Sequence, residues 1–128
     1  KDSMFNTPPV FAVYACKLSM EWLKSIGGIK EIEKINRLKA KKLYDEIDNN
    51  ELFKGFAAVE DRSIMNVTFN LTDESNKSIF DEIALKKNIS GINGHRSVGG
   101  YRASIYNALS LESVETLVDA MKQFEKNI

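Results

Sequence analysis

The first thirty residues carry apolar side chains on more than one side of a predicted helix. Thr7 is a good N-cap residue and Pro8 suits the first helical position, so the sequence predicts a helix over residues 8–26 that ends at Gly27 and Gly28. Its apolar positions are Val10, Phe11, Val13, Tyr14, Leu18, Trp22, Leu23 and Ile26. A helix with so wide an apolar surface is packed from several sides. We therefore expect it to meet another domain or a second subunit, and to promote some self-association.

A second helix is predicted directly after the first, with its apolar positions near one face. Over residues 29–47 these positions are Ile29, Ile32, Ala40, Leu43 and Ile47. Most of the charged side chains between them fall elsewhere on the helix, and we interpret them as a solvated face. The Asp-Asn-Asn sequence of residues 48–50 then breaks the periodicity.

The middle of the chain changes from the period of a helix to that of a strand. Residues 53–59 form an ambiguous apolar patch that suits a short strand. Residues 64–71 alternate apolar Val67, Phe69 and Leu71 with polar Asn66, Thr68 and Asn70. This alternation predicts a strand with one face in water. Thr72 and Asp73 then cap a helix to about residue 87, whose inward positions are Ile79, Phe80, Ile83 and Ala84.

The last third predicts two strands and a closing helix. The strands cover residues 89–92 and 103–107, and a glycine-rich loop joins them. The helix begins at Ser110, and its core positions are Val114, Leu117, Val118, Met121 and Phe124. Two helices followed by β-α-β-β-α predict an α+β fold: a two-layer sandwich in which helices cover a small mixed or antiparallel sheet.

Length and charge narrow the classes of protein. A chain of 128 residues fits one domain over residues 1–128, and its 18 basic and 18 acidic residues cancel. We therefore expect no nucleic-acid partner and no anionic membrane surface. No apolar run approaches the roughly 20 residues that span a bilayer, so we expect a soluble, cytoplasmic protein. Cys16 is the single cysteine, and we expect it to be buried. Because the chain begins at Lys1 rather than at methionine, we expect it to be part of a longer polypeptide.

Residues 94–102 concentrate the groups that bind anions. They contain the only histidine, His95, two arginines, Arg96 and Arg102, and three glycines. Arginine presents a planar fork of donors to a carboxylate or phosphate, and glycine lets backbone approach a ligand closely. The two arginines are predicted to hold two acidic groups of one small molecule, with His95 as a further donor. The alternative is a glycine-rich hairpin with solvated arginines, in which His95 caps a turn.

A second anion site is predicted at the start of the first helix. Asn6 and Thr7 offer an amide, a hydroxyl and backbone N–H groups at a helix N-terminus, where phosphate is the natural guest. An ordinary N-cap is the alternative, since Pro8 and Pro9 have no N–H to donate. The sequence contains no metal-ligand cluster and no lysine in the apolar context that Schiff-base chemistry needs. By residue chemistry alone the chain binds acidic groups and lacks the means to transform them.

Four strings, in this order and spacing, resemble the C-terminal part of the phosphoserine aminotransferase family over essentially the whole chain. They are residues 6–9 (NTPP), 62–67 (RSIMNV), 94–102 (GHRSVGGYR) and 103–108 (ASIYNA). The family consists of class V, fold type I transaminases that use pyridoxal phosphate and work as homodimers in serine biosynthesis. The resemblance implies amino exchange between O-phosphoserine and 2-oxoglutarate, which gives 3-phosphohydroxypyruvate and glutamate. In many bacteria it also implies a role in pyridoxine synthesis through 4-phosphohydroxythreonine.

The resemblance also implies roles for individual residues. Asn6 and Thr7 match the pair that reaches across the dimer to the phosphate of the cofactor. His95 and Arg96 match the pair that binds the substrate phosphate, and Arg102 matches the arginine that receives the α-carboxylate. Tyr101 and Asn93 depart from the family pattern, in which methionine and lysine are expected.

The resemblance implies that other catalytic groups lie upstream. The Schiff-base lysine, the acidic partner of the pyridine nitrogen and the stacking aromatic residue belong to a larger domain, so residues 1–128 form a C-terminal small domain and residues 1–28 a helix at the junction. We expect no transamination by this chain alone. The alternatives are a free-standing module that binds a phosphorylated metabolite or protein, and a domain of another class V aminotransferase or desulfurase.

Overall fold

The computed structural model describes residues 5–128; residues 1–4, which include Lys1, lie outside the described residues. The chain divides into two compact units, Lys1–Lys34 and Ile35–Ile128. No helix within residues 5–128 has both the length and the apolar character that crossing a membrane requires.

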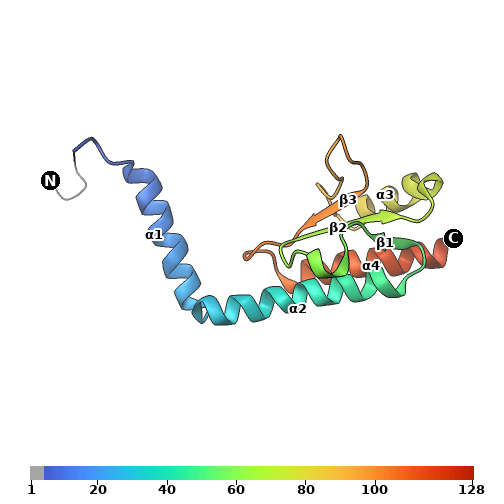
Figure 1. Cartoon of the computed structure of the whole chain (residues 1–128), viewed down its shortest axis with the longest axis horizontal. Helices are drawn as coiled ribbons and strands as arrows, with labels where there is room; N and C mark the ends of the chain where they lie inside the picture. Colours follow the sequence, from blue (N-terminus) through green and yellow to red (C-terminus); the bar gives the residue numbers. More distant parts are fainter. Residues whose placement is uncertain (1–4) are drawn as a thin grey trace. The chain divides into compact units, whose positions relative to one another are not determined.

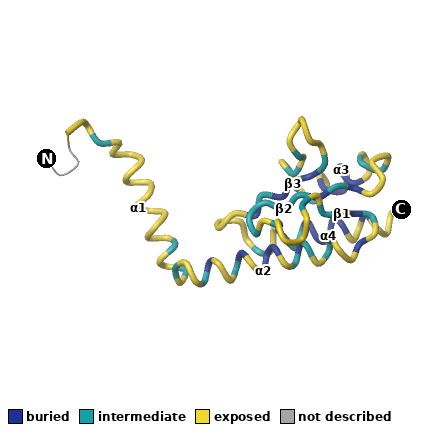
Figure 2. The backbone as a smooth tube through the Cα atoms, in the orientation of Figure 1, coloured by how far each residue is buried: buried dark blue, intermediate teal, exposed yellow. Residues whose placement is uncertain are grey.

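The first unit contains helix α1, Val10–Ser25 (Figure 1), whose residues are nearly all exposed (Figure 2). The whole helix lies within the described residues, and none of its side chains is buried. Phe11 is 84% exposed and Trp22 is 41% exposed. The prediction of a buried Cys16 is wrong, because its side chain is exposed on this helix. The wide apolar surface read from the sequence is therefore present and uncovered.

The start and end of α1 are set by its proline and glycine residues. The N-cap residue is Pro9 and not Thr7, and no side chain caps the helix. The prediction of Thr7 as N-cap is wrong because both prolines precede the first helical residue. At the other end Gly27 adopts a φ of +102°, a left-handed conformation that glycine adopts without steric cost.

Helix α2, Gly28–Asn49, is the predicted amphipathic helix. Ile32, Ala40, Leu43 and Ile47 are buried as expected. Ile29 is 73% exposed, so its assignment to the inner face is wrong. It occupies the first turn of the helix, three residues before the first buried position.

The second unit is built on a three-stranded antiparallel sheet (Figure 1). Its strands are β1 (Phe53–Gly55), β2 (Asn66–Leu71) and β3 (Tyr101–Ser104), in the order β1-β2-β3. Helix α3 (Lys77–Lys86) connects β2 to β3, and helix α4 (Leu111–Asn127) follows β3; short 3-10 turns lie at Val59–Asp61 and Glu74–Asn76. The α+β prediction is confirmed, and the strands are antiparallel throughout.

The predicted order β-α-β-β-α is wrong, and the observed order is β-β-α-β-α. Residues 89–92 do not form a strand. Asn88 closes α3 with a φ of +58°, and the N–H of Ile89 bonds to the carbonyl of Ala84, as in a Schellman motif. Gly91 adopts a φ of +70° three residues later. Two left-handed residues leave too little extended backbone for a strand, and only Asn93 forms a bridge to β3.

The core of the second unit lies between one face of the sheet and the helices. The register places Phe69 opposite Tyr101 and Val67 opposite Ala103, and all four are buried. Five aromatic rings meet there at centroid distances of 5.1–5.8 Å: Phe53, Phe69, Phe80, Tyr101 and Phe124. Such pairs each contribute about 0.5–1.5 kcal/mol beyond burial of their area. Ile79 was predicted to face inward and is 38% exposed, because Phe80 occupies the inward position beside it.

The opposite face of the sheet is polar. Thr68 and Asn70 alternate with the buried residues of β2, and the register sets Arg102 of β3 opposite Thr68. Arg102 is exposed. The predicted wet face therefore exists, and it carries one of the candidate site residues.

A salt bridge fixes the segment between β1 and β2. The Arg62 guanidinium forms two bonds to the carboxylate of Asp48 on α2, at 2.6 and 2.7 Å, and lies over the ring of Tyr44 at 4.5 Å. The hydrogen bonds from Arg62 lower the pKa of Asp48. Because solvent reaches the Asp48 side chain, the pair adds little to the free energy of unfolding. Its main effect is to fix the position of the segment between β1 and β2.

Lys39 is a buried lysine that the sequence pattern did not distinguish from the solvated face of α2. Its Nζ donates to three carbonyl oxygens of the turn after β3, those of Ile105 (3.2 Å), Tyr106 (2.8 Å) and Leu109 (3.0 Å). Burial lowers the pKa of Lys39, whereas three acceptors match the three protons of its ammonium group. Lys39 therefore ties α2 to the turn that joins β3 to α4.

Replacing Lys39 by methionine keeps the unbranched apolar stem of the side chain and removes its ammonium group. Three buried or half-buried carbonyls lose a donor, so we expect Lys39→Met to lower the free energy of unfolding by about 2 kcal/mol. The control is Lys41→Met on the same helix, which breaks only the exposed pair with Asp45 and is expected to cost about 0.5 kcal/mol or less. Urea unfolding of both variants measures the difference; equal losses would contradict the structural role of Lys39.

Candidate functional site

Three of the candidate anion-binding residues, His95, Arg96 and Arg102, lie on a narrow hairpin whose outgoing arm is β3. The N–H of Arg102 donates to the carbonyl of Ile92 at 2.7 Å, and the N–H of Gly94 donates to the carbonyl of Gly100 at 2.8 Å. Asn93 and Tyr101 form an antiparallel bridge between these two bonds. The expectation that the loop joins two strands of the sheet is thus wrong on one side. The outgoing arm is β3, whereas the incoming arm pairs with it through the single bridge at Asn93. We call residues 94–100 the glycine loop.

Three glycines allow the glycine loop to close tightly. A Cβ on Gly94 would lie 2.0 Å from the carbonyl oxygen of Gly99. A Cβ on Gly100 would lie 1.9 Å from Oδ1 of Asn70, and Gly100 also has a φ of +64°. Gly99 has a φ of +78° but open space around it. Neighbouring atoms leave no room for a Cβ at Gly94 or Gly100, so glycine is required at both positions. At Gly99 only the left-handed backbone favours glycine.

His95 begins the turn at the tip of the glycine loop. Its carbonyl accepts hydrogen bonds from the N–H groups of Val98 and Gly99, both at 2.8 Å. Its Nδ1 accepts from the N–H of Ser97 at 3.3 Å and lies 2.7 Å from the Ser97 hydroxyl. With Nδ1 used as an acceptor, the ring proton is on Nε2. His95 thus caps a turn, and its Nε2–H stays available as a donor.

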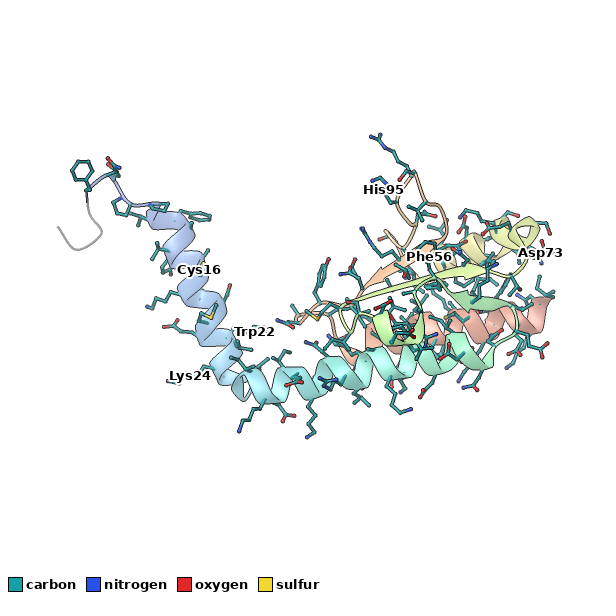
Figure 3. The ribbon with its side chains drawn as sticks, viewed as in Figure 1. Cys16, Trp22, Lys24, Phe56, Asp73 and His95 are labelled. Atoms are coloured by element: carbon teal, nitrogen blue, oxygen red, sulfur yellow. The ribbon has the colours of Figure 1, made fainter. Side chains whose placement is uncertain are left out.

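His95 and Arg102 line one cavity of about 180 Å³. The other lining residues are Phe56, Thr68, Asn70, Gly94, Val98, Gly99 and Tyr101. Figure 3 labels His95 on the glycine loop and Phe56 on the segment after β1. Arg96, the next residue of the loop, is exposed and does not line this cavity. The structure therefore brings His95 and Arg102 together and leaves Arg96 outside.

Sequence patterns missed three residues of this cavity, namely Phe56, Thr68 and Asn70. The alternation in β2 identified Thr68 and Asn70 as solvated, but only the register with β3 sets them beside Arg102. Phe56 belonged to an ambiguous apolar patch, and its side chain is 59% exposed. An exposed phenylalanine beside a cationic cavity can exclude water from a bound anion and so strengthen its electrostatic attraction.

Asn6 and Thr7 precede α1 in the first unit, and both are exposed. Within residues 5–128 neither side chain has a hydrogen-bond partner. The backbone N–H of Val10 donates to the carbonyl of Pro8, and no side chain caps the helix after Pro9. The amide, the hydroxyl and the uncapped first turn are thus free to bind an anion.

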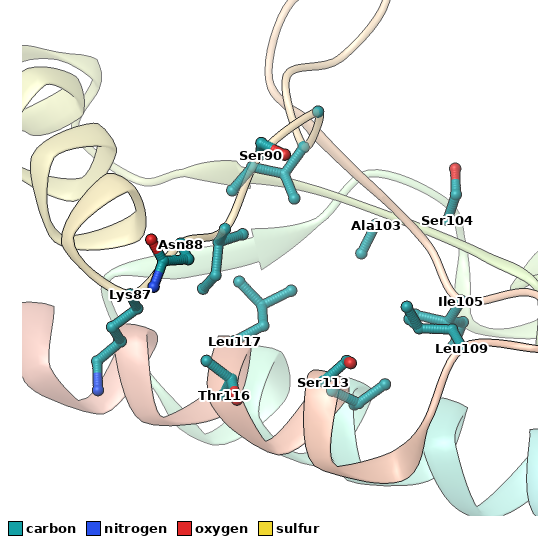
Figure 4. A pocket seen from close by; sticks show the side chains of 14 residues that line it. Lys87, Asn88, Ser90, Ala103, Ser104, Ile105, Leu109, Ser113, Thr116 and Leu117 are labelled. Atoms are coloured by element: carbon teal, nitrogen blue, oxygen red, sulfur yellow. The ribbon is translucent and has the colours of Figure 1, made fainter.

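A larger cavity, of about 370 Å³, lies elsewhere in the second unit (Figure 4). It is bounded by the segment after α3, by the end of β3 and by α4, which contributes Ser113 and Thr116. Lys87 is the single charged residue that lines it, and none of the predicted site residues does. Its greater volume does not make it the better candidate, because the candidate anion-binding side chains His95 and Arg102 line the smaller cavity.

Comparison with known proteins identifies the family of this chain. The family model of class-V aminotransferases matches residues 1–117, and the chain belongs to that family. A curated relative, the phosphoserine aminotransferase of Flavobacterium psychrophilum, is 58% identical over 127 residues. This alignment covers 99% of the present chain and 36% of the relative, so the chain spans about a third of the length of the curated relatives it matches.

Solved structures of the same kind match the fold. A structure of phosphoserine aminotransferase studied for radiation damage of its Schiff base is 45% identical, with a TM-score of 0.90, and the match covers 99% of this chain and 36% of that one. A phosphoserine aminotransferase from Trichomonas vaginalis with bound pyridoxal phosphate is 38% identical, with a TM-score of 0.83 and coverages of 94% and 35%.

Substituting alanine at Gly99 and at Gly100 distinguishes the cost of a left-handed backbone from the cost of a steric clash with β2. Both substitutions force a side chain into a left-handed conformation, which costs about 1–2 kcal/mol. Gly100→Ala also drives a Cβ into Asn70, so we expect it to lower the free energy of unfolding by at least about 1 kcal/mol more than Gly99→Ala does. Thermal and urea unfolding of the two variants measure this gap. A Gly99→Ala variant as unstable as Gly100→Ala would contradict the tight packing of the glycine loop on β2.

Proposed function

We propose that this chain works as part of a pyridoxal-phosphate-dependent phosphoserine aminotransferase. The reaction exchanges an amino group between O-phosphoserine and 2-oxoglutarate and gives 3-phosphohydroxypyruvate and glutamate, a step of serine biosynthesis. Membership in the class-V aminotransferase family and relatives of that name at 53–58% identity support the proposal. The observation within the chain that carries it is the convergence of His95 and Arg102 on one cavity.

We assign the substrate's anionic groups to three side chains. Arg102 extends from the polar face of the sheet, and its guanidinium suits the α-carboxylate, since a planar fork of donors binds two carboxylate oxygens at once. His95 offers Nε2–H to the substrate phosphate, and Arg96 adds a full positive charge beside it in sequence. Because Arg96 lies outside the cavity that contains Arg102, it binds the phosphate from the exposed side of the glycine loop.

Asn6 and Thr7 fit the phosphate of the cofactor. Both side chains are exposed and without intramolecular partners, and the helix that follows them has no side-chain cap. The partial positive charge of the N-terminus of α1 adds to their hydrogen bonds. When bound, pyridoxal phosphate supplies the electron sink that transamination requires.

We place the Schiff-base lysine outside this chain. Lys39 is a buried lysine of the second unit, but its Nζ is engaged by three carbonyl oxygens. A lysine held in this way cannot turn toward a cofactor without leaving three carbonyls unpaired. The present residues therefore bind and orient substrate and cofactor, and we expect no transamination by residues 1–128 alone.

The same proposal includes a homodimer in the cytoplasm. The uncovered apolar side chains of α1, which include Phe11, Tyr14 and Trp22, support a partner surface on that helix. Asn6 and Thr7 would reach the cofactor of the second subunit. A role in pyridoxine synthesis with 4-phosphohydroxythreonine belongs to the proposal as well, since this substrate shares the phosphate and the α-carboxylate.

Substituting Arg96 in the intact polypeptide tests the phosphate assignment. Arg96→Ala removes one charge-assisted contact to the phosphate, which is worth about 1.5–3 kcal/mol, so kcat/KM for O-phosphoserine should fall about 10–100-fold. Activity with unphosphorylated serine, weak in any case, should change by less than about threefold, because serine has no group for Arg96 to bind.

The control is Lys126→Ala, which removes an exposed charge from the last turn of α4 and should leave both substrates unaffected. If the Arg96 variant lost serine and phosphoserine activity in the same proportion, the residue would not be a phosphate ligand. A domain of another class V aminotransferase would then be the better assignment. A free-standing module would be indicated if the intact polypeptide bound phosphoserine but no pyridoxal phosphate.

A further inference from the structure

Lys77 connects the two arms of the hairpin that carries the glycine loop. Its Nζ lies 3.2 Å from Oδ1 of Asn93 on the incoming arm and 3.2 Å from the hydroxyl of Tyr101 on the outgoing arm. The carboxylate of Asp81, one turn along α3, accepts from both Lys77 (2.8 Å) and the Tyr101 hydroxyl (2.7 Å). A single ammonium group thus bridges Asn93 and Tyr101, the pair at which the hairpin closes.

The position of Lys77 is unfavourable for the helix itself. Lys77 is the first residue of α3, where the helix dipole is positive and a cation is destabilising. Contacts with other residues can compensate for this unfavourable charge, and Lys77 makes such contacts with Asp81, Asn93 and Tyr101. Because Asp81 neutralises Lys77, the cluster adds little net charge beside the cavity of His95 and Arg102.

The tyrosine is held on both sides. Its ring stacks on Phe69 at 5.3 Å and meets Phe80 edge to face at 5.1 Å, so the side chain is anchored in the core. Burial, together with the bond to Asp81, raises the pKa of the Tyr101 hydroxyl, which therefore stays protonated and donates to the carboxylate. Lys77 therefore links Asn93 of the incoming arm to a tyrosine that the core of the second unit holds in place.

We propose that Lys77, held by Asp81, is a positioning residue that closes the glycine hairpin through Asn93 and Tyr101 and thereby fixes His95 against Arg102. Among residues 5–128 the incoming arm pairs with a strand only through this bridge. Without the contacts of Lys77, the two hydrogen bonds that close the hairpin would therefore open more often. The part of this inference that concerns substrate binding rests on the proposed function. The part that concerns closure of the hairpin does not.

Amide hydrogen exchange of the intact polypeptide, without substrate, tests the closure directly. The N–H groups of Gly94 and Arg102 form the two closing bonds and serve as probes. We expect Lys77→Met to speed exchange at both probes about tenfold, the effect of losing one charge-assisted hydrogen bond, while the buried β2 amide of Val67 changes little. The matched control is Lys86→Met at the other end of α3, which breaks the exposed pair with Glu82 and should leave all three probes unchanged.

A second variant covers the case in which Lys77→Met unfolds the chain. Tyr101→Phe keeps the ring in the aromatic cluster and removes only the hydroxyl, so it should also speed exchange at Gly94 and Arg102. If neither variant speeded exchange at these two amides relative to Val67, closure of the hairpin by Lys77 would be refuted. It would also be refuted if Lys86→Met speeded exchange there as much as Lys77→Met does.

Kinetics of the holoenzyme then tests the consequence for the substrate. Lys77→Met should raise KM for O-phosphoserine about tenfold and change kcat by less than about twofold, because Lys77 does not touch the reacting atoms. Lys77→Arg, which keeps the charge and can reach both arms, should restore most of the affinity. A wild-type holoenzyme that fails to transaminate phosphoserine would sink the proposed function without affecting the exchange result. An unchanged KM together with faster exchange would overturn the positioning role of Lys77.

Discussion

The pairing of β2 with β3 decides which side chains enter the core and which face the cavity. Phe69 pairs with Tyr101 on the buried face, and Thr68 pairs with Arg102 on the polar face. Because side chains alternate along a strand, a slip of one residue would bury the Arg102 guanidinium among aromatic rings and expose Tyr101. An unpaired buried charge costs several kcal/mol, so the aromatic core and the placement of Arg102 enforce the same register. The site is therefore a consequence of how the core packs.

The glycine loop reaches the polar face of the sheet because Gly100 has no side chain. Gly100 approaches Asn70 so closely that no Cβ fits, which brings the outgoing arm of the hairpin directly onto β2. The tip of the loop then sets His95 at the cavity that Arg102 lines from the strand below. Two donors from different local structures, a turn and a strand, meet at one place because the strand register and the glycine contact are both satisfied. By its chemistry such a pair suits a ligand with more than one acidic group.

Local patterns predicted most elements, and the failures come from left-handed backbone in one segment and from long-range contacts elsewhere. The helical periods gave α2 and α4, and the alternation of Val67, Phe69 and Leu71 gave β2. The strand expected at residues 89–92 failed because Asn88 and Gly91 adopt left-handed conformations that periodicity does not reveal. Lys39 looked like one more solvated lysine, since its carbonyl partners lie 66 to 70 residues away in sequence. Motif chemistry located His95 and Arg102, whereas Thr68 and Asn70 joined the site only through the register of the sheet.

The proposed function depends on His95, Arg96 and Arg102 binding the acidic groups of the substrate. A crystal structure of the pyridoxal-phosphate holoenzyme with O-phosphoserine bound tests it most directly. We expect Arg102 within about 3 Å of an α-carboxylate oxygen, and His95 Nε2 and Arg96 at the same distance from phosphate oxygens. Either subunit of the dimer could provide each contact. Side chains of His95, Arg96 and Arg102 that all face bulk solvent, remote from substrate and coenzyme, would contradict the account.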